Sequence, residues 1–446
     1  MSRFLAGTKR ANCVFACTKP PEVLYGIRSA SIIYARRCPL ATSKGRGGSR
    51  TAPTCTPCML ASGCFMGKCI AHSESRDTRY AIRNTQYAIR NKKYFIMLID
   101  QLNKQQPLRI INSAAPTRVC DNGGWTDTWF AEYGKIFNIA VYPCAEVQIE
   151  VYSHDGDGER VVIHAENYDD LYVRHLDTDW QRHPLLEATI DHLAVPDDMA
   201  VKINIFSEAP AGASIGTSAA VTVALIGALD ALTGGRLALH EVAYAAQIIE
   251  TKKLGQQCGI QDQLCAAYGG INYIDMFQYP YASVSQLHLP LATLLELERR
   301  LALIYLGQPH NSSQVHEKVI RHLEDSGPTA PPLKALRMTA QPSRNALYAG
   351  DFVALGRAMT QNTEAQRNLH PFLVSPDCDR IIEIAKSHGA LGWKVNGAGG
   401  DGGSITLLCG PNAHAKRTMI REIEEENPLY HNLPIRLSPS GLRVWG

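Results

Sequence analysis

The 446-residue chain is predicted to form an α+β fold of about two domains. Residues 144–152 alternate apolar and polar side chains, which is typical of a half-buried antiparallel strand. Residues 219–229 form an apolar block with the length of a buried helix. The length exceeds what one hydrophobic core usually organises, and we expect a first domain over 97–295 and a second over 296–446.

Composition and charge exclude several classes of protein. Apolar residues make up 45% of the chain and charged residues 20%, as in globular proteins. No apolar run approaches the roughly 20 residues that span a bilayer, so no membrane association is expected. The six cysteines scattered beyond residue 96 suit a reducing compartment, and we expect a cytoplasmic protein.

Residues 1–96 differ in composition from the rest of the chain. They hold 17 Lys and Arg against three acidic residues, together with seven of the 13 cysteines. They show neither helical nor strand periodicity, which predicts a largely disordered or non-native leader. The preferred hypothesis is that this leader is upstream DNA read in frame, with initiation at Met97.

Three alternatives for the leader stay open. Its Arg-rich, acid-poor composition is typical of a transit peptide, apart from the cysteines. Cys55, Cys58, Cys64 and Cys69 are candidate zinc ligands, although their spacing lacks paired CxxC motifs. The basic charge would also suit nucleic acid, but no regular aromatic spacing supports this, and no nucleic-acid partner is expected.

Beyond residue 107, successive segments are predicted to be ordered. Strands are expected at 110–114, 144–152, 160–165 and 201–206, with a charged hairpin turn over 154–159. Helices are expected at 219–229 and 238–253, separated by the stop signal of Gly234 and Gly235. The remaining predictions are a central strand at 301–306, a helix from His310 through Val319, mostly helical structure over 331–388, and a strand, glycine turn and strand over 393–409.

The stretch 210–230, PAGASIGTSAAVTVALIGALD, predicts a glycine-containing loop that feeds the start of a helix. Glycines let a backbone approach a phosphate, and the free N–H groups of a first helical turn point toward it. The hydroxyls of Thr217 and Ser218 are placed to cap that turn or to bind a magnesium ion. The spacing matches neither a Walker A loop nor the dinucleotide fingerprint, and a loop that only caps a core helix is the alternative.

Polar residues cluster in three further motifs. CDNGGWTDT (120–128) is a glycine turn that carries two aspartates, and GQQCGIQDQLCAAYGG (255–270) presents Asp262 in a polar turn before a helix. KVNGAGGDGGS (394–404) is a glycine-rich turn between strands. Glu250 falls near the C-terminal end of the helix at 238–253, where the helix dipole disfavours a carboxylate unless a cation is close.

PAGASIGTSAA, KVNGAGGDGGS and TRVCDNGGWTDT together resemble the three motifs of the GHMP kinase family, in order and over about 107–446. GGWTDT and GIQDQLCAAYGG are most similar to the branch that contains L-fucokinase and the bacterial heptose-7-phosphate kinases. The resemblance implies a left-handed βαβ connection in the N-terminal half and a ferredoxin-like C-terminal half. It also implies that ATP binds in the cleft between the two halves.

The resemblance further implies a role for each motif residue. Asp262 is expected to accept the proton of the substrate hydroxyl, with Arg118 beside it. Ser218 and Glu250 are the expected magnesium ligands. The expected ATP contacts are Pro210, Gly212, Ala213, Ser214, Gly216, Thr217 and Ser218. The expected substrate contacts are Asp121, Gly124, Trp125, Thr126, Asp127, Gly399 and Gly400.

Purely structural roles stay open for several of these residues. Arg118 and Asp127 are alternatively an ion pair across a tight turn. Glu250 is alternatively a solvated helix end, and Asp262 a helix cap. Trp125 is either a wall of the acceptor site or a core residue.

Two positions depart from the family pattern. Ser214 stands where the phosphate loop usually has glycine, which is tolerated if its φ stays negative. Asp401 interrupts the third glycine motif, and we expect it to face away from the phosphates or to be offset by magnesium or a basic side chain.

These observations together predict an ATP- and magnesium-dependent kinase that phosphorylates a hydroxyl of a sugar or sugar phosphate, with the anomeric hydroxyl as the expected acceptor. One alternative is a kinase for a non-sugar alcohol such as mevalonate, although the first motif supplies only Arg118 to bind an acid. The other is a non-catalytic sugar- and ATP-binding regulator of the same fold. A monomer or homodimer is expected.

Overall fold

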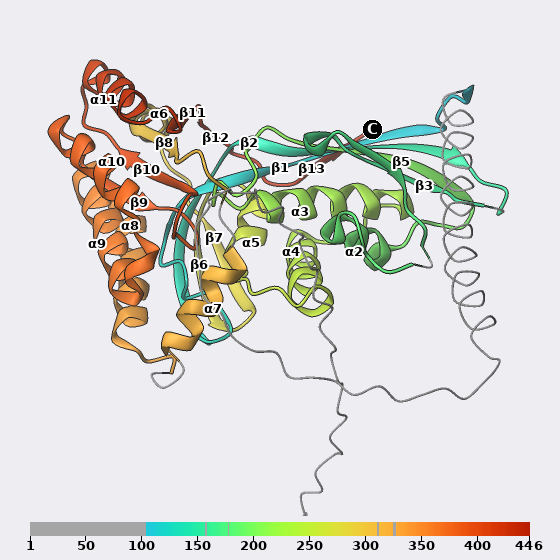
Figure 1. Cartoon of the computed structure of the whole chain (residues 1–446), viewed down its shortest axis with the longest axis horizontal. Helices are drawn as coiled ribbons and strands as arrows, with labels where there is room; N and C mark the ends of the chain where they lie inside the picture. Colours follow the sequence, from blue (N-terminus) through green and yellow to red (C-terminus); the bar gives the residue numbers. More distant parts are fainter. Residues whose placement is uncertain (1–103, 157, 177, 310–311, 324–326) are drawn as a thin grey trace, which may run out of the picture. The chain divides into compact units, whose positions relative to one another are not determined.

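The computed structural model describes residues 104–156, 158–176, 178–309, 312–323 and 327–446 (Figure 1). The predictions for the leader at 1–96 and for initiation at Met97 lie outside the described residues. Within the described residues, no helix is both long and apolar enough to cross a membrane.

A large, mostly antiparallel sheet forms the first half of the fold. Its strands are β1 Arg109–Asn122, β2 Gly134–Ser153, β3 Val161–Ala165, β4 Asp170–Val173, β5 Met199–Ser207, β6 Ile271–Gln278, β7 Tyr281–Gln286, β12 Arg436–Leu437 and β13 Arg443–Trp445. The order is β13-β1-β2-β5-β3-β4, while β6 and β12 also pair with β2 and β7 pairs with β6. All four strands predicted in this half are confirmed, although β2 begins ten residues earlier than the alternating pattern indicates.

Helices cover one face of this sheet (Figure 1). They are α2 Pro184–Leu193, α3 Thr217–Asp230, α4 Leu239–Ile248 and α5 Gln261–Tyr268. The alternation of β2 directs Val147, Ile149 and Val151 into the same core as the apolar residues of α3, which burial of apolar surface stabilises. A π-helical turn, Ile249–Lys253, extends α4 and completes the helix predicted over 238–253.

The parallel pair β3 and β5 is connected through β4 and α2, which gives the βαβ unit implied by the family resemblance. Short 3₁₀ turns lie at Glu166–Tyr168 before β4 and at Ala231–Thr233 after α3. Gly234 follows the second of these with a φ of +106°, a left-handed conformation that ends the helix as its sequence predicts.

The second half is built on a four-stranded antiparallel sheet. Its strands are β8 Leu301–Tyr305, β9 Gly392–Val395, β10 Ser404–Leu408 and β11 His431–Leu433, in the order β11-β8-β10-β9. The helices are α6 Leu291–Arg300, α7 Ser312–Leu323, α8 Pro331–Tyr348, α9 Phe352–Leu369, α10 Pro376–Ser387 and α11 Ala413–Glu426, with a 3₁₀ turn at Pro371–Leu373. Numbered from β8, the strand order is 4-1-3-2 with helices after the first and third strands, so the ferredoxin-like prediction is confirmed.

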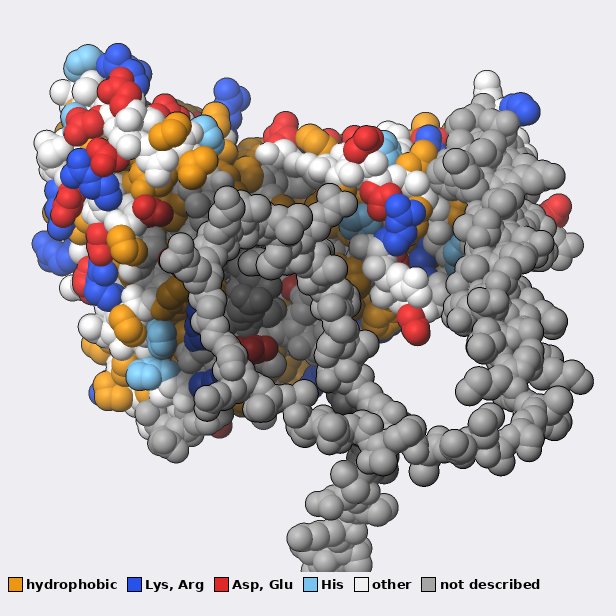
Figure 2. All heavy atoms as spheres, in the orientation of Figure 1, with side chains coloured by type: hydrophobic (Ala, Val, Ile, Leu, Met, Phe, Trp, Pro, Cys, Tyr) orange, Lys and Arg blue, Asp and Glu red, His pale blue; other side chains and the backbone are white. Residues whose placement is uncertain are grey.

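Charged side chains of both signs are interspersed over the outer C-terminal helices (Figure 2). Arg380 on α10 joins α11 through a 2.8 Å bond from its Nε to Glu426. A separate hydrophobic core connects Phe137 and Ile139 of β2 with Met359 of α9. The two sheets are therefore held together by apolar packing as well as by chain connections.

The last strands return to the large sheet. β13 pairs with β1, and β12 pairs with β2. The C-terminal residues thus contribute to the sheet of the first half, and the boundary at 295/296 stays a prediction.

Candidate active site

The loop before α3 has a backbone suited to an anion. Gly212, Ser214 and Gly216 have φ values of +73°, +60° and +75°, and they alternate with residues of negative φ. Such an alternation turns successive N–H groups toward one side and forms a concave anion-binding nest. Gly216 is also the N-cap of α3 and has no side chain to occupy the first-turn N–H groups. The condition of a negative φ at Ser214 is not met, because the alternation places this residue in the left-handed region.

Arg118 and Asp262 meet across the site as a bidentate pair. Arg118 on β1 donates from Nε to Asp262 Oδ1 at 2.8 Å and from Nη2 to Oδ2 at 3.1 Å, and its Nη1 donates to the carbonyl of Ser214. Burial disfavours the charged guanidinium, but the carboxylates of Asp262 and Asp121 outweigh it and raise the Arg118 pKa. The alternative pairing of Arg118 with Asp127 is wrong.

Asp262 lies directly beside the loop. A Cβ on Gly216 would be 3.3 Å from Asp262 Cγ, so glycine permits this close approach. The Asp262 side chain is 29% exposed, whereas that of Arg118 is 4% exposed. The arginine therefore orients the carboxylate from behind while the carboxylate faces the open space.

Asp127 caps the helix that carries Asp262. Its Oδ2 accepts hydrogen bonds from the backbone N–H groups of Ile260 and Gln261, each at 3.0 Å, at the start of α5. Asp262 itself makes no capping bond at the N-cap of α5. The helix is therefore capped by Asp127 and not by Asp262. Burial raises the Asp127 pKa to about 6, with further contributions from Asp262 and Asp121, although the bond from Gln261 opposes the rise.

These residues surround a cavity of about 400 Å³. Its walls include Trp125, which is 4% exposed and whose ring centroid lies 4.6 Å from that of His316 on α7. Trp125 also belongs to a buried cluster with Val315 and Val319, so it is both a cavity wall and a core residue. Its indole N–H has no hydrogen-bond partner among the described residues.

Glu250 lies on another wall of the same cavity. It is 5% exposed and accepts a 2.9 Å bond from Gln263 Nε2, so the alternative of a solvated helix end is wrong. Burial raises its pKa to about 7, with Asp262 adding to the rise and the bond from Gln263 opposing it. Ser218 lines the same cavity.

The oxygen ligands that these cavity residues offer suit a hard cation that is also bound by phosphates. Ser218 and Glu250 offer oxygen ligands, and the buried Thr217 Oγ1 and Gln263 Oε1 have no partner among the described residues. The described residues hold no group of three or more His, Cys, Asp or Glu side chains arranged around one metal position. Magnesium is typically held by one or two carboxylates together with substrate phosphates. Ser218 and Glu250 could supply the protein ligands of such a site.

A second cavity of about 560 Å³ opens on the other side of the loop. It shares Gly212, Thr217, Ser218 and Gln256 with the first cavity. Its remaining walls are largely apolar and come from β3, β5, α2, the start of the loop and α3, including Ala165, Leu185, Ile205, Pro210 and Val221. Sequence reasoning missed the walls that β3, β5 and α2 supply, because α2 was not predicted and no motif covers these residues.

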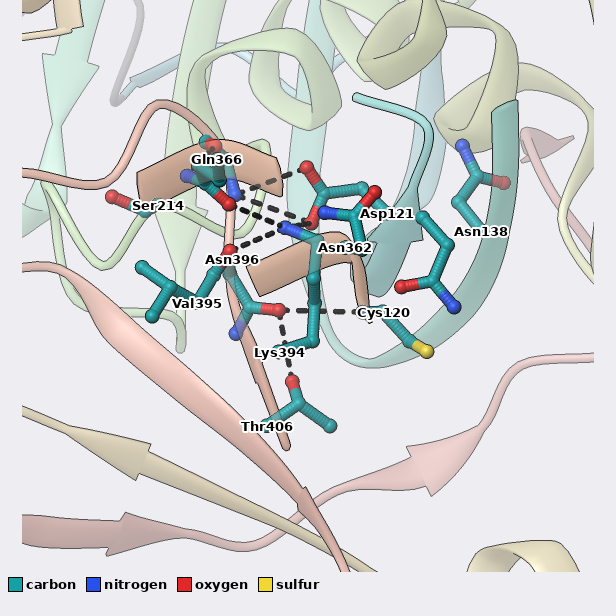
Figure 3. A network of polar contacts seen from close by, with 12 residues as sticks. Cys120, Asp121, Asn138, Ser214, Asn362, Gln366, Lys394, Val395, Asn396 and Thr406 are labelled. Carbon is teal, nitrogen blue, oxygen red and sulfur yellow. Dashed lines mark hydrogen bonds and ion pairs between the residues drawn. The ribbon is translucent and has the colours of Figure 1, made fainter. Parts of the chain in front are cut away.

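Five of the predicted substrate contacts do not line the first cavity. Asp121 is fully buried, and its Oδ1 lies 3.1 Å from Lys394 Nζ (Figure 3). Thr126 donates its hydroxyl to the carbonyl of Gly123 at 2.6 Å. Gly124, Gly399 and Gly400 likewise lie behind the wall; the N–H of Gly400 bonds to the carbonyl of Leu373 at 3.1 Å. These residues shape the wall, whereas Trp125 and Asp127 reach the cavity as predicted.

The third glycine motif reaches the site through different residues from those predicted. Gly397 and Ala398 line the cavity. A Cβ on Gly397 would be 2.9 Å from the carbonyl oxygen of Ser214 and 3.1 Å from Arg118 Nη2, so this turn touches the loop. Asp401 is exposed and does not line the cavity, which confirms that it faces away.

An anion-binding loop next to an arginine-held carboxylate defines a small-molecule kinase. Comparison with known families matches residues 185–270 to the GHMP kinases N terminal domain and residues 343–426 to the GHMP kinases C terminal domain. The chain therefore carries the N-terminal and C-terminal domains of GHMP kinases, and its fold is that of the family.

Relatives of the chain include several kinases. It is 24% identical over 329 residues to a bifunctional fucokinase/GDP-fucose pyrophosphorylase of Arabidopsis thaliana, covering 70% of this chain and 31% of that protein. It is 24% identical over 247 residues to a D-glycero-alpha-D-manno-heptose 7-phosphate kinase of Campylobacter jejuni, covering 55% and 71%. A mevalonate kinase of Methanothermobacter thermautotrophicus is 32% identical over 220 residues, covering 49% and 66%.

Among solved structures, a D-glycero-D-manno-heptose 1-phosphate kinase from Bacteriodes thetaiotaomicron superposes with a TM-score of 0.59 at 22% identity. The match covers 75% of this chain and 99% of that one. The chain therefore spans less than a third of the length of the Arabidopsis relative. It spans most of the length of the two heptose phosphate kinases.

Proposed function

We propose that this protein transfers the terminal phosphoryl group of ATP to a hydroxyl of a sugar or sugar phosphate, with the anomeric hydroxyl as acceptor. The observation that carries the proposal is the position of Asp262, which touches the anion-binding loop at Gly216 and faces the cavity that holds Asp127. Phosphoryl transfer needs in-line positioning, charge neutralisation and a base for the attacking hydroxyl.

Each part of the site has a task in this reaction. The loop at 212–218 binds the nucleotide phosphates through its N–H groups, and the apolar second cavity receives the nucleoside. Arg118 fixes the Asp262 carboxylate with two parallel bonds, and Asp262 accepts the proton of the substrate hydroxyl. Asp127 accepts hydrogen bonds from neighbouring hydroxyls of the acceptor.

Magnesium would be held by Ser218 and Glu250 together with the phosphates. When bound, it supplies charge neutralisation on the phosphate oxygens. Thr217 also lines this cavity, and its buried hydroxyl has no hydrogen-bond partner among the described residues, so we assign it to the nucleotide phosphates.

The fucokinase and heptose 7-phosphate kinase relatives favour a sugar as the acceptor. The mevalonate kinase relatives support the alternative, a non-sugar alcohol. A non-catalytic regulator would have no need for the buried arginine that positions Asp262. We further propose a cytoplasmic monomer or homodimer, in keeping with the six free thiols among the described residues.

The test is a screen of free monosaccharides, sugar phosphates and mevalonate for ATP consumption by the full chain, with the phosphorylated position determined by NMR. We expect turnover with at least one sugar or sugar phosphate and a product phosphorylated at the anomeric oxygen. Turnover with mevalonate and with no sugar would overturn the proposal.

A further inference from the structure

We infer that the acceptor is an uncharged sugar and not a sugar phosphate or a hydroxy acid. This inference rests on the proposed function and narrows it. It follows from the charges on the walls of the first cavity, because a second anionic group on the acceptor would need a cation to offset it.

Cationic side chains are scarce on these walls. Among the described residues that line the cavity, Arg118 is the single lysine or arginine. Its guanidinium is bound to both oxygens of Asp262 and to the carbonyl of Ser214, and the side chain is 4% exposed. An acceptor phosphate would have to displace Asp262 from Arg118 to reach this charge.

Basic side chains near the site are directed elsewhere. Lys318 lies two residues beyond His316 on α7, but it is exposed and lies over the ring of Phe372, 3.9 Å from its centroid. Lys135, Lys334 and Arg337 line a separate surface hollow that shares no lining residue with the first cavity. The described part of the chain thus has a basic hollow, but not where the acceptor would bind.

Carboxylates outnumber cations on the cavity walls. Asp127, Glu250 and Asp262 all line it. Glu250 is a proposed magnesium ligand together with Ser218, and Arg118 offsets Asp262. Asp127 remains without a basic partner and bonds only to backbone N–H groups of Ile260 and Gln261 in the hydrogen bonds described. An anionic acceptor group beside Asp127 would meet a like charge in a buried site.

The uncharged residues on the cavity walls suit a neutral polyol. Trp125 offers an aromatic face and an indole N–H that has no partner among the described residues. Thr128 adds a hydroxyl group. An aromatic face packs against the C–H surface of a sugar ring, while a few placed polar groups fix its hydroxyls.

The inference is tested with matched pairs of acceptors and the full chain. Each pair is an aldose and the same aldose with a phosphate on its terminal carbon, including a heptose with its 7-phosphate and galactose with its 6-phosphate. We expect kcat/KM to be at least about tenfold higher for the free sugar of a productive pair. A higher kcat/KM for the phosphorylated member would overturn the inference and leave the sugar-kinase proposal standing, whereas turnover of mevalonate alone would overturn both.

A charge variant tests the cause of the preference. Gln257 lines the cavity and accepts a 2.6 Å bond from Trp129 Nε1, so Gln257→Met is the control for losing this amide. Relative to that control, Gln257→Lys should raise kcat/KM for the phosphorylated sugar by about tenfold and leave the free sugar within about threefold. Equal effects of the two variants on both sugars would contradict a preference set by charge.

Discussion

Lys394 and Asp121 form a buried ion pair beneath the site, with Nζ 3.1 Å from Oδ1 and both side chains 1% exposed. The pair joins β9 of the small sheet to β1 of the large sheet, and Lys394 also donates to Gln366 Oε1 on α9 at 3.2 Å (Figure 3). Asp121 accepts the N–H of Gly397 at 3.1 Å, which fixes the turn that touches Ser214 and Arg118. A contact between the two sheets thus sets the position of the Arg118–Asp262 pair.

Removing Lys394 should therefore destabilise the fold. Lys394→Met leaves the Asp121 carboxylate buried without its cation, and we expect a loss of about 3–5 kcal/mol in the free energy of unfolding. Urea unfolding measures this loss. In the Asp121→Asn background the same substitution should cost less than half as much, and an equal cost in both backgrounds would show that the two residues are not coupled.

Asp262→Asn should abolish turnover and spare nucleotide binding. The amide keeps the shape of the side chain but cannot accept the substrate proton, so kcat should fall by about 100- to 10,000-fold. The Kd for ATP, measured by calorimetry, should change by less than about threefold. Asp275→Asn is the matched control, because Asp275 is half-exposed on β6 and pairs with Lys135 at the surface. Parallel loss of ATP binding and turnover would point to a structural aspartate.

Ser214→Gly should stabilise the protein. Ser214 has a φ of +60°, which costs an L-residue energy that glycine avoids. After the entropic cost of glycine in the unfolded chain, we expect a net gain of about 0.5–1 kcal/mol, measured by thermal and urea unfolding. Ser214→Ala keeps the Cβ and removes only the hydroxyl, so it separates strain from side-chain bonding. If the glycine variant were less stable than the alanine variant, the inference that the left-handed φ at residue 214 is strained would be wrong.

The sequence predicts those parts of the fold whose signal is local. The alternation of β2 and the apolar length of α3 determine their own burial, because a strand or helix with these patterns has one stable way to face a core. Glu250, Arg118 and Asp262 reach the cavity as the motifs indicate. Sequence reasoning could not predict β12 and β13, because strands of two and three residues carry no periodicity.

Residues whose role depends on a distant partner are also beyond sequence reasoning. Asp121 and Asp127 belong to the same sequence motif, yet Asp121, at the end of β1, meets Lys394, 273 positions along the chain, whereas Asp127 faces the cavity. Nothing local separates two aspartates in one glycine-containing motif. The left-handed φ of Ser214 likewise follows from the path of the loop between β5 and α3, and not from the preference of serine.

Asp127→Asn should change the pH dependence of stability in a defined direction. Burial raises the Asp127 pKa from its ordinary value of about 4 to about 6, so the folded state holds this proton more tightly than the unfolded state. The folded state is therefore favoured at low pH, and this contribution is lost as pH rises from about 4 to about 6.

The asparagine variant carries no such titration and keeps an oxygen that accepts from the N–H groups of Ile260 and Gln261. Relative to wild type, its free energy of unfolding should rise by about 1–3 kcal/mol between pH 4 and pH 7. Urea unfolding at a series of pH values measures the difference, with Asp275→Asn as the control for a half-exposed carboxylate. A difference that does not vary with pH would mean that Asp127 titrates as it does in the unfolded chain, and that the two backbone N–H groups offset its burial in full.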